Sequence, residues 1–235
     1  MNGLGIKAIC FDYYGTLVDI GQPFVEIRKW FEAIILREKR KISIDEFNMS
    51  FTRQRAKYTY DNNFMTGYDL LEKSYINTCG KYGLNSYTME FNLFISNLFS
   101  TAIAYKDAID TINKLKQKYT LGLITNADND VLYKSIQNQG FQFDFVISSE
   151  DAKFNKPRRE IFDYALEKLE LLPDKVLMVG DSLVDDIFAA KSLGINTIWI
   201  NRSNSILYKN TLQIKDLNEI LQYTLERQEL YGEDI

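Results

Sequence analysis

Two aspartates follow short apolar segments that predict buried strands. Asp12 follows Ile6–Phe11, and Asp181 follows Val176–Val179 after the single residue Gly180. The carboxyl ends of parallel strands meet at one sheet edge, where ligands bind, so we expect the two carboxylates to lie close together. Two carboxylates at contact distance repel each other unless a cation lies between them. Oxygen ligands suit Mg²⁺, so the pair predicts a magnesium site beside a carboxylate that could attack phosphorus.

Three more positions could complete this site. Thr125 and Asn126 lie at the end of the predicted strand Leu121–Thr125, and Lys156 precedes Pro157. A lysine ammonium group, a threonine hydroxyl and backbone N–H groups can hold a negatively charged phosphoryl group. Each residue alone is more often a helix cap, a turn residue or a solvated loop residue. The order and spacing of the whole set are what predict a site.

Composition excludes several other kinds of chemistry. The 235 residues include no histidine, which excludes Ser-His-Asp and Cys-His catalysis and histidine-ligated zinc or haem. A formal charge of −4 argues against general nucleic-acid binding. Two separate cysteines, Cys10 and Cys79, and the lack of a visible signal peptide or long apolar run favour a cytoplasmic protein. We expect a small-molecule substrate, no nucleic-acid or membrane partner, and a monomer or homodimer.

The elements that would position these residues alternate between strand and helix. The predicted strands are Ile6–Phe11, Leu121–Thr125, Phe145–Ser148, Val176–Val179 and Thr197–Ile200. Their nearly continuous apolar runs are typical of strands that are covered on both faces. Amphipathic patterns predict helices near 108–115, 161–169, 183–193 and 217–225. The alternation indicates an α/β protein with a doubly wound, five-stranded parallel sheet.

A long helical segment interrupts this alternation after the first strand. Apolar stripes predict helices near 24–35, 44–60, 67–81 and 88–98. We therefore expect an α/β core domain made of residues 1–19 and 105–235. Residues 20–104 are predicted to form a helical cap domain over the sheet edge.

At these residues the chain resembles the haloacid dehalogenase (HAD) superfamily of hydrolases, which has a Rossmann-like core. The family's first motif, Asp-x-Asp-Gly-Thr-Leu, matches residues 12–17 except at its third position. Its second and third motifs match Thr125 and Lys156, and its fourth, Gly-Asp-x-x-x-x-Asp, matches residues 180–186. A helical cap after the first motif is also a family feature, so the resemblance covers nearly the whole chain.

The resemblance implies a nucleophile and a set of metal ligands. Asp12 would be the nucleophile and also a ligand of Mg²⁺. Tyr14 would provide its backbone carbonyl, and Asp181 would be a further carboxylate ligand. The second acid of the fourth motif would be Asp186, with Asp185 as a rival for that role.

The resemblance also implies a set of substrate-binding residues. Thr125 and Lys156 would hold the transferring group and act with the nucleophile in catalysis. Asn126, Gly15 and Thr16 would add substrate contacts, and Gly15 would allow the tight backbone that phosphoryl binding requires.

One departure from the family pattern leaves the reaction open. Phosphatases of the family place an acid-base aspartate where this chain has Tyr14, whereas its 2-haloacid dehalogenases have tyrosine there and need no metal. Those dehalogenases lack an aspartate corresponding to Asp181 and tend to have tyrosine at the position of Phe162.

Because an anionic Asp181 beside Asp12 is best explained by a cation, we favour a magnesium-dependent phosphohydrolase that acts on a small organic phosphate through an aspartyl-phosphate. The alternatives are a 2-haloacid dehalogenase and a catalytically weak protein that binds a phosphate ligand.

Overall fold

The structure is a computed structural model that describes residues 5–19, 21, 23–59, 63–202 and 211–223. The chain divides into two compact units. The first comprises Met1–Asp19, Ile103–Asn126 and Ile136–Ile235, and the second comprises Ile20–Ala102 and Ala127–Ser135. Among the described residues, no helix has the length and apolar character needed to cross a bilayer.

Six parallel strands form the sheet of the first unit. Their spatial order is β5 (Phe145–Ser148), β4 (Thr120–Thr125), β1 (Ala8–Phe11), β6 (Val176–Gly180), β7 (Asn196–Ile200) and β8 (Gln213–Ile214). The chain order reverses at β1, which lies between β4 and β6, so the carboxyl ends of these three strands are neighbours. This arrangement confirms the predicted doubly wound sheet. The sixth strand, β8, was not predicted, because two residues are too few to show a periodic pattern.

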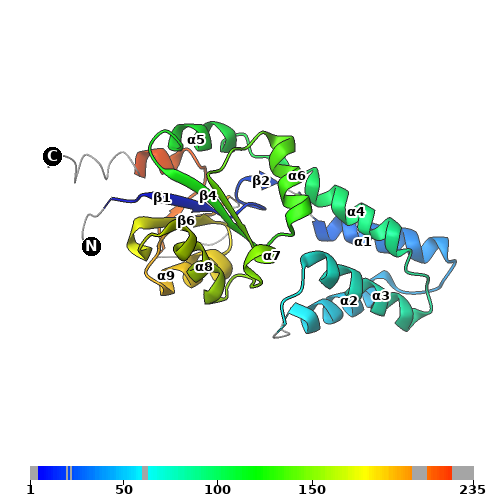
Figure 1. Cartoon of the computed structure of the whole chain (residues 1–235). Coiled ribbons are helices and arrows are strands. Elements are labelled where there is room, and N and C mark those ends of the chain that lie inside the picture. Colours follow the sequence, from blue (N-terminus) through cyan, green and yellow to red (C-terminus); the bar gives the residue numbers. More distant parts are fainter. Residues whose placement is uncertain (1–4, 20, 22, 60–62, 203–210, 224–235) are drawn as a thin grey trace, which may run out of the picture. The chain divides into compact units, whose positions relative to one another are not determined.

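Helices cover both faces of the sheet. Figure 1 shows α5 (Ala108–Leu115) on one face and α8 (Arg159–Leu169) and α9 (Ala189–Ser192) on the other. Cys10 and Met178 belong to the core that also includes buried residues of α8 and α9. All four residues of β1 and all five of β6 are buried, which explains their unbroken apolar runs.

Several shorter elements complete the first unit. They include β2 (Val18–Asp19), β3 (Ile103–Ala104), α7 (Ser149–Ala152), η1 (Pro173–Lys175) and η2 (Leu183–Phe188). The β2 and β3 strands pair in antiparallel fashion and so bring the two ends of the intervening segment together. The helix predicted near 183–193 begins as the π-helix η2 and continues as α9. Of the helix predicted near 217–225, residues 219–223 are helical and the last two lie outside the described residues.

The second unit is mainly helical and has an aromatic core. Its helices are α1 (Pro23–Arg37), α2 (Ile44–Thr59), α3 (Gly67–Tyr82), α4 (Thr88–Ser100) and the first part of α6 (Asn129–Gln139). The rings of Tyr75 and Phe91 stack with their centroids 4.1 Å apart, and those of Trp30 and Phe94 stack at 5.1 Å. Neither α6 nor the grouping of Ala127–Ser135 with the helical unit is predicted from the sequence pattern.

A buried carboxylate joins the two segments of the second unit. Asp128 accepts hydrogen bonds of 2.7 Å and 2.6 Å from the backbone N–H groups of Gly67 and Tyr68. These groups lie at the first turn of α3, where backbone donors lack partners within the helix and negative charge is favourable. Asp128 therefore stabilises the start of α3.

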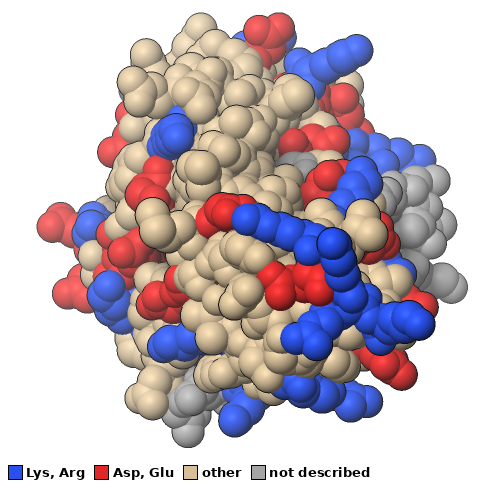
Figure 2. Space-filling model, turned by 90° about the vertical axis from the view of Figure 1, so that its right-hand side faces the viewer, with Lys and Arg blue, Asp and Glu red and all other residues tan. Residues whose placement is uncertain are grey.

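Charged side chains of both signs lie among uncharged ones on the face shown in Figure 2. On the face shown in Figure 2, basic side chains lie beside acidic ones. Exposed ion pairs of the second unit include Arg28–Asp45 and Arg37–Glu90, both at 2.8 Å. Exposed pairs of this kind contribute little to stability, about 0–1 kcal/mol each.

Candidate active site

A cavity of about 250 Å³ lies at the carboxyl ends of β1, β4 and β6. Its lining residues are Asp12, Tyr14, Thr125, Asn126, Lys156, Asp181, Ser182, Asp185 and Asp186. The structure thus brings together seven of the nine predicted site residues, together with Asp185. Gly15 and Thr16 do not line the cavity, although both lie in the loop after β1.

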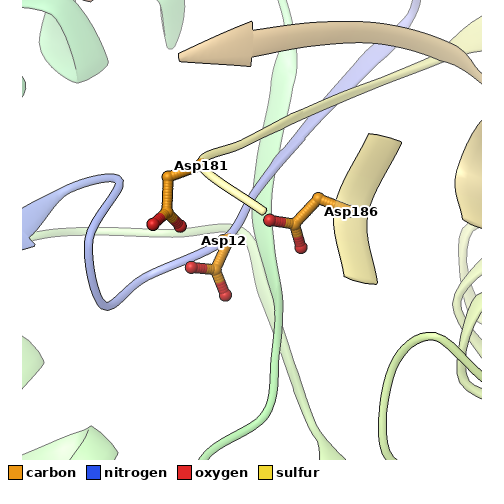
Figure 3. Close-up of side chains that lie close together, drawn as sticks. All are labelled: Asp12, Asp181 and Asp186. Atoms are coloured by element: carbon orange, nitrogen blue, oxygen red, sulfur yellow. The ribbon is translucent and has the colours of Figure 1, made fainter. Parts of the chain in front are cut away.

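Three carboxylates converge at this cavity. Each of Asp12, Asp181 and Asp186 offers an oxygen that lies within 4.8 Å of the others (Figure 3). Asp12 follows β1, Asp181 follows β6, and Asp186 comes from η2. The structure therefore places Asp186 in this carboxylate cluster. Asp185 lines the same cavity outside the cluster.

Two glycines allow the carboxylates to approach the backbone. Gly15 has a φ of +90°, and a Cβ atom there would overlap the carboxylate of Asp181. A Cβ atom on Gly180 would overlap the side chain of Asp186. A larger residue at either position would therefore displace one of the clustered carboxylates.

A buried ammonium group faces the carboxylate cluster. The Lys156 side chain is 2% exposed, and its Nζ donates hydrogen bonds of 2.7 Å to Asp12 and 2.5 Å to Asp186. Burial alone would lower the pKa of Lys156, but the two carboxylates raise it above its ordinary value. Lys156 therefore stays charged and offsets part of the negative charge of the cluster.

The negative charge that Lys156 does not offset helps to raise the pKa values of two of the clustered carboxyl groups. Although Asp181 is partly exposed to solvent, desolvation of its carboxyl group, followed by repulsion from the carboxylates of Asp12 and Asp186, raises its pKa to about 7. Burial likewise raises the pKa of Asp186 to about 6, although the positive charge of Lys156 and its hydrogen bond oppose this. A donor set of three carboxylates with a single neighbouring ammonium group fits a hard divalent cation.

Asn126 and Lys156 are held together through two amide hydrogen bonds. The Asn126 side chain donates a 3.0 Å bond to the Lys156 carbonyl and accepts a 2.7 Å bond from its backbone N–H. The sequence resemblance predicts that Asn126 binds substrate. The structure shows that its side chain contacts the backbone of the cavity's lysine. Thr125 is buried at the end of β4 and lines the cavity beside them.

Two further residues support the carboxylate side of the cavity, and the sequence motifs do not identify them. Ser182 donates its backbone N–H to Asp186 at 3.0 Å, and its hydroxyl accepts the N–H of Asp185 at 3.1 Å. Trp199 donates its indole N–H to the backbone carbonyl of Asp181 at 2.8 Å. Trp199 is opposite Gly180 in the β6–β7 pairing, a register that its apolar segment does not reveal.

Comparison with known proteins gives relatives of two kinds. The chain is 32% identical to YfnB of Bacillus subtilis, named as a HAD-hydrolase, over 119 residues, which cover 48% of this chain and 51% of YfnB. It is 32% identical over 112 residues to pyrimidine 5'-nucleotidase YjjG of Escherichia coli, covering 46% of this chain and 49% of YjjG. It is 24% identical over 210 residues to (S)-2-haloacid dehalogenase 4A of Burkholderia cepacia, covering 85% of each chain. The matches to YfnB and YjjG thus span about half of those relatives.

A solved structure extends the similarity to the whole fold. The structure of YfnB bound to magnesium matches with a TM-score of 0.73 at 20% identity and covers 94% of this chain and 99% of YfnB. The sequence profile of the haloacid dehalogenase-like hydrolases matches residues 6–194. The chain therefore belongs to the haloacid dehalogenase-like hydrolases.

Proposed function

We propose that this protein is a magnesium-dependent phosphohydrolase that acts on a small organic phosphate. The observation that carries the proposal is the clustering of Asp181 and Asp186 around Asp12 beside a buried lysine. Lys156 offsets only part of the negative charge of the three carboxylates, and a bound cation would offset the rest. YjjG, named as a nucleotidase, and YfnB, whose solved structure is bound to magnesium, support this choice.

Asp12, Asp181 and Asp186 would hold the magnesium ion, with the backbone carbonyl of Tyr14 as a further ligand. Carboxylate and carbonyl oxygens are the ligands that Mg²⁺ prefers. The bound ion would neutralise charge on the transferring phosphoryl group and orient it.

The side chains around Asp12 would carry out a two-step transfer. An Asp12 carboxylate oxygen attacks phosphorus while the bond from phosphorus to the leaving oxygen breaks, which forms an aspartyl-phosphate. Lys156 and Thr125 hold the negatively charged phosphoryl oxygens during this step. Water then attacks the phosphorus of the aspartyl-phosphate, and the bond from phosphorus to the Asp12 oxygen breaks. Inorganic phosphate leaves with one proton of the water, the other proton passes to the departed alkoxide or phenoxide, and the Asp12 carboxylate is restored.

The residue Tyr14 restricts which substrates this site can process quickly. A phenol with an ordinary pKa of about 10 protonates a leaving alcohol poorly near neutral pH. Substrates whose leaving groups need little protonation should therefore react fastest. We further propose that the segment 20–104 acts as a cap that selects the substrate and excludes water.

A 2-haloacid dehalogenase is the second candidate, because Tyr14 matches that class and dehalogenase 4A is similar over 85% of this chain. Asp12 would then displace halide directly, and halide leaves without a proton. The opposing observation is electrostatic. Asp181 and Asp186 in their ionised forms would repel the carboxylate of a 2-haloacid.

One experiment separates these candidates. The purified chain is assayed with an aryl phosphate, several alkyl phosphates and 2-chloropropionate, each with MgCl₂ and with a chelator. We expect phosphate release from the aryl ester with Mg²⁺ only. Asp12→Asn should lower turnover by about 10³-fold or more. Asp163→Asn, which makes the same chemical change at an exposed site on α8, is the matched control and should leave turnover unchanged.

The other results would contradict the proposal in different ways. Halide release without metal would identify a dehalogenase. Metal-dependent binding of phosphate ligands without turnover of any ester would identify a binding protein. Full phosphatase activity in Asp12→Asn would exclude Asp12 as the nucleophile.

A further inference from the structure

An arginine outside the cavity contacts the loop that follows β1. Arg202 comes two residues after β7 and does not line the cavity. Its Nη1 donates a 2.9 Å hydrogen bond to Oδ2 of Asp107, and its Nη2 donates a 3.2 Å bond to Oδ1 of the same carboxylate. The guanidinium group also lies 3.7 Å from the centroid of the Tyr105 ring. Three contacts thus fix the plane of this guanidinium group.

The anchor of Arg202 is itself held in place. Asp107 is buried, and its Oδ2 also accepts a 2.7 Å hydrogen bond from the backbone N–H of Leu217. A carboxylate oriented by a backbone donor presents its two oxygens in a fixed direction. It can therefore hold the planar fork of an arginine in one orientation.

The same guanidinium group reaches the loop of the first motif. Nη2 of Arg202 donates a 2.7 Å hydrogen bond to the backbone carbonyl of Thr16. The Thr16 hydroxyl donates a 3.3 Å bond to Asp181, which belongs to the carboxylate cluster. A chain of contacts therefore runs from Asp107 through Arg202 and Thr16 to a candidate metal ligand.

We propose that Arg202 is a positioning residue that holds the loop after β1 in its working conformation. The proposal rests on the proposed function, in which this loop follows the nucleophile Asp12 and provides the Tyr14 carbonyl as a ligand. Gly15 and Thr16 do not line the cavity, so they affect the site through the conformation of this loop and through the bond from Thr16 to Asp181. Arg202 holds the loop through the Thr16 carbonyl.

Arginine is suited to this role because it forms several directed bonds at once. Its fork pairs with both oxygens of Asp107 while an N–H of Nη2 remains for Thr16. A lysine has one nitrogen and cannot reproduce the planar bidentate pair and the ring contact together. Arg202→Lys should therefore keep the charge but lose part of the positioning.

The test measures the loop directly by hydrogen exchange. The N–H groups of Gly15, Leu17 and Val18 are hydrogen-bonded within the loop, so their exchange reports its order. In Arg202→Ala we expect these amides to exchange about tenfold faster, while amides of β4 keep their rates. Millimolar guanidinium should restore protection by occupying the vacated space between Asp107 and Tyr105. Equal concentrations of urea or NaCl should not.

Turnover provides the second measurement. In the folded fraction of Arg202→Ala, kcat/KM for an aryl phosphate should fall about 10–100-fold, because a small misplacement of binding groups has effects of this size. Arg202→Lys should show a smaller loss, which keeps the test valid if the alanine variant is poorly folded. Arg159→Ala, which removes an exposed arginine from α8, is the control and should match the unaltered chain.

The outcomes separate this proposal from the proposed function. Unchanged loop exchange in Arg202→Ala, or equal rescue by guanidinium and urea, overturns the positioning role. Faster exchange with unchanged kcat/KM also overturns it. If guanidinium restores exchange but the unaltered chain hydrolyses no phosphate ester, Arg202 does position the loop and the proposed function is the part that fails.

Discussion

The ammonium nitrogen of Lys156 lies 2.7 Å from a carboxylate oxygen of Asp12, and 144 residues separate the two in the chain. Both side chains are nearly inaccessible to solvent. The same nitrogen also donates to Asp186. One ammonium group therefore serves two buried carboxylates, and its removal would leave both without a cation.

We expect Lys156→Met to destabilise the metal-free protein by about 3–5 kcal/mol, since breaking a buried ion pair leaves an uncompensated charge. The free energy of unfolding in urea, with and without MgCl₂, checks this. Mg²⁺ should recover part of the loss. Lys114→Met, on the exposed side of α5, should change stability by less than about 0.5 kcal/mol. A similarly small effect in Lys156→Met would show that the pair contributes little.

The carboxylate cluster should make both stability and metal binding depend on pH. Burial and neighbouring carboxylates raise the pKa of Asp181 to about 7 and that of Asp186 to about 6. A raised pKa in the folded state adds stability that is complete below the unfolded pKa of about 4. This stability is then lost progressively as pH rises from about 4 to about 7. The metal-free protein should therefore become less stable over this range.

Bound Mg²⁺ requires the ionised carboxylates, so the stabilisation that it gives should increase as pH rises. We expect MgCl₂ to raise Tm more at about pH 8 than at about pH 5, because protons compete with the metal at the lower pH. Asp181→Asn should remove most of this difference. Equal Tm shifts at both pH values would count against a metal site made of these carboxylates.

The identity of residue 14 should determine the dependence of rate on the leaving group. The unaltered chain should hydrolyse aryl phosphates faster than alkyl phosphates. Tyr14→Asp should raise the rate on alkyl phosphates by up to about 10²–10⁴-fold, the usual range for acid-base catalysis. The measurement is kcat/KM across esters of graded leaving-group pKa. If Tyr14→Asp gives no gain on alkyl phosphates, the rate of the unaltered chain is not limited by a missing proton donor.

The Asn126–Lys156 hydrogen bonds give a prediction that separates two roles of Asn126. If the amide positions the lysine, Asn126→Ala should lower kcat by up to about 10²-fold with little change in Mg²⁺ binding. If the amide binds substrate instead, KM should rise while kcat stays the same. Asn113→Ala, at an exposed position of α5, is the control and should alter neither constant.

Much of the fold could be predicted because burial on both faces leaves a clear pattern in the sequence. β1 and β6 are buried at every position, so their apolar runs have no polar interruption. β8 left no such signal, since two residues become a strand only by pairing with β7. The helix α6 was missed because only Val131, Leu132 and Ser135 of its residues are buried.

The choice between Asp185 and Asp186 shows the limit of motif spacing. Adjacent side chains on a helix point in different directions, and the carboxylate cluster includes Asp186 but not Asp185. The π-helix η2 turns Asp186 toward Asp12 and Lys156. This orientation of Asp186 depends on how Leu183–Phe188 packs against β6 and β7. The spacing of residues in the motif does not reveal that packing.

By itself, the amino-acid sequence determined which chemical groups the protein has: carboxylates, a lysine and a threonine after apolar strands, and no histidine. Only the tertiary structure decided which of these groups meet. It places Asn126 on the lysine backbone, Trp199 on the carbonyl of Asp181 and Arg202 on that of Thr16. The reason is physical: such contacts depend on strand register and helix packing between distant segments, whereas local sequence patterns report only which surfaces of an element are buried.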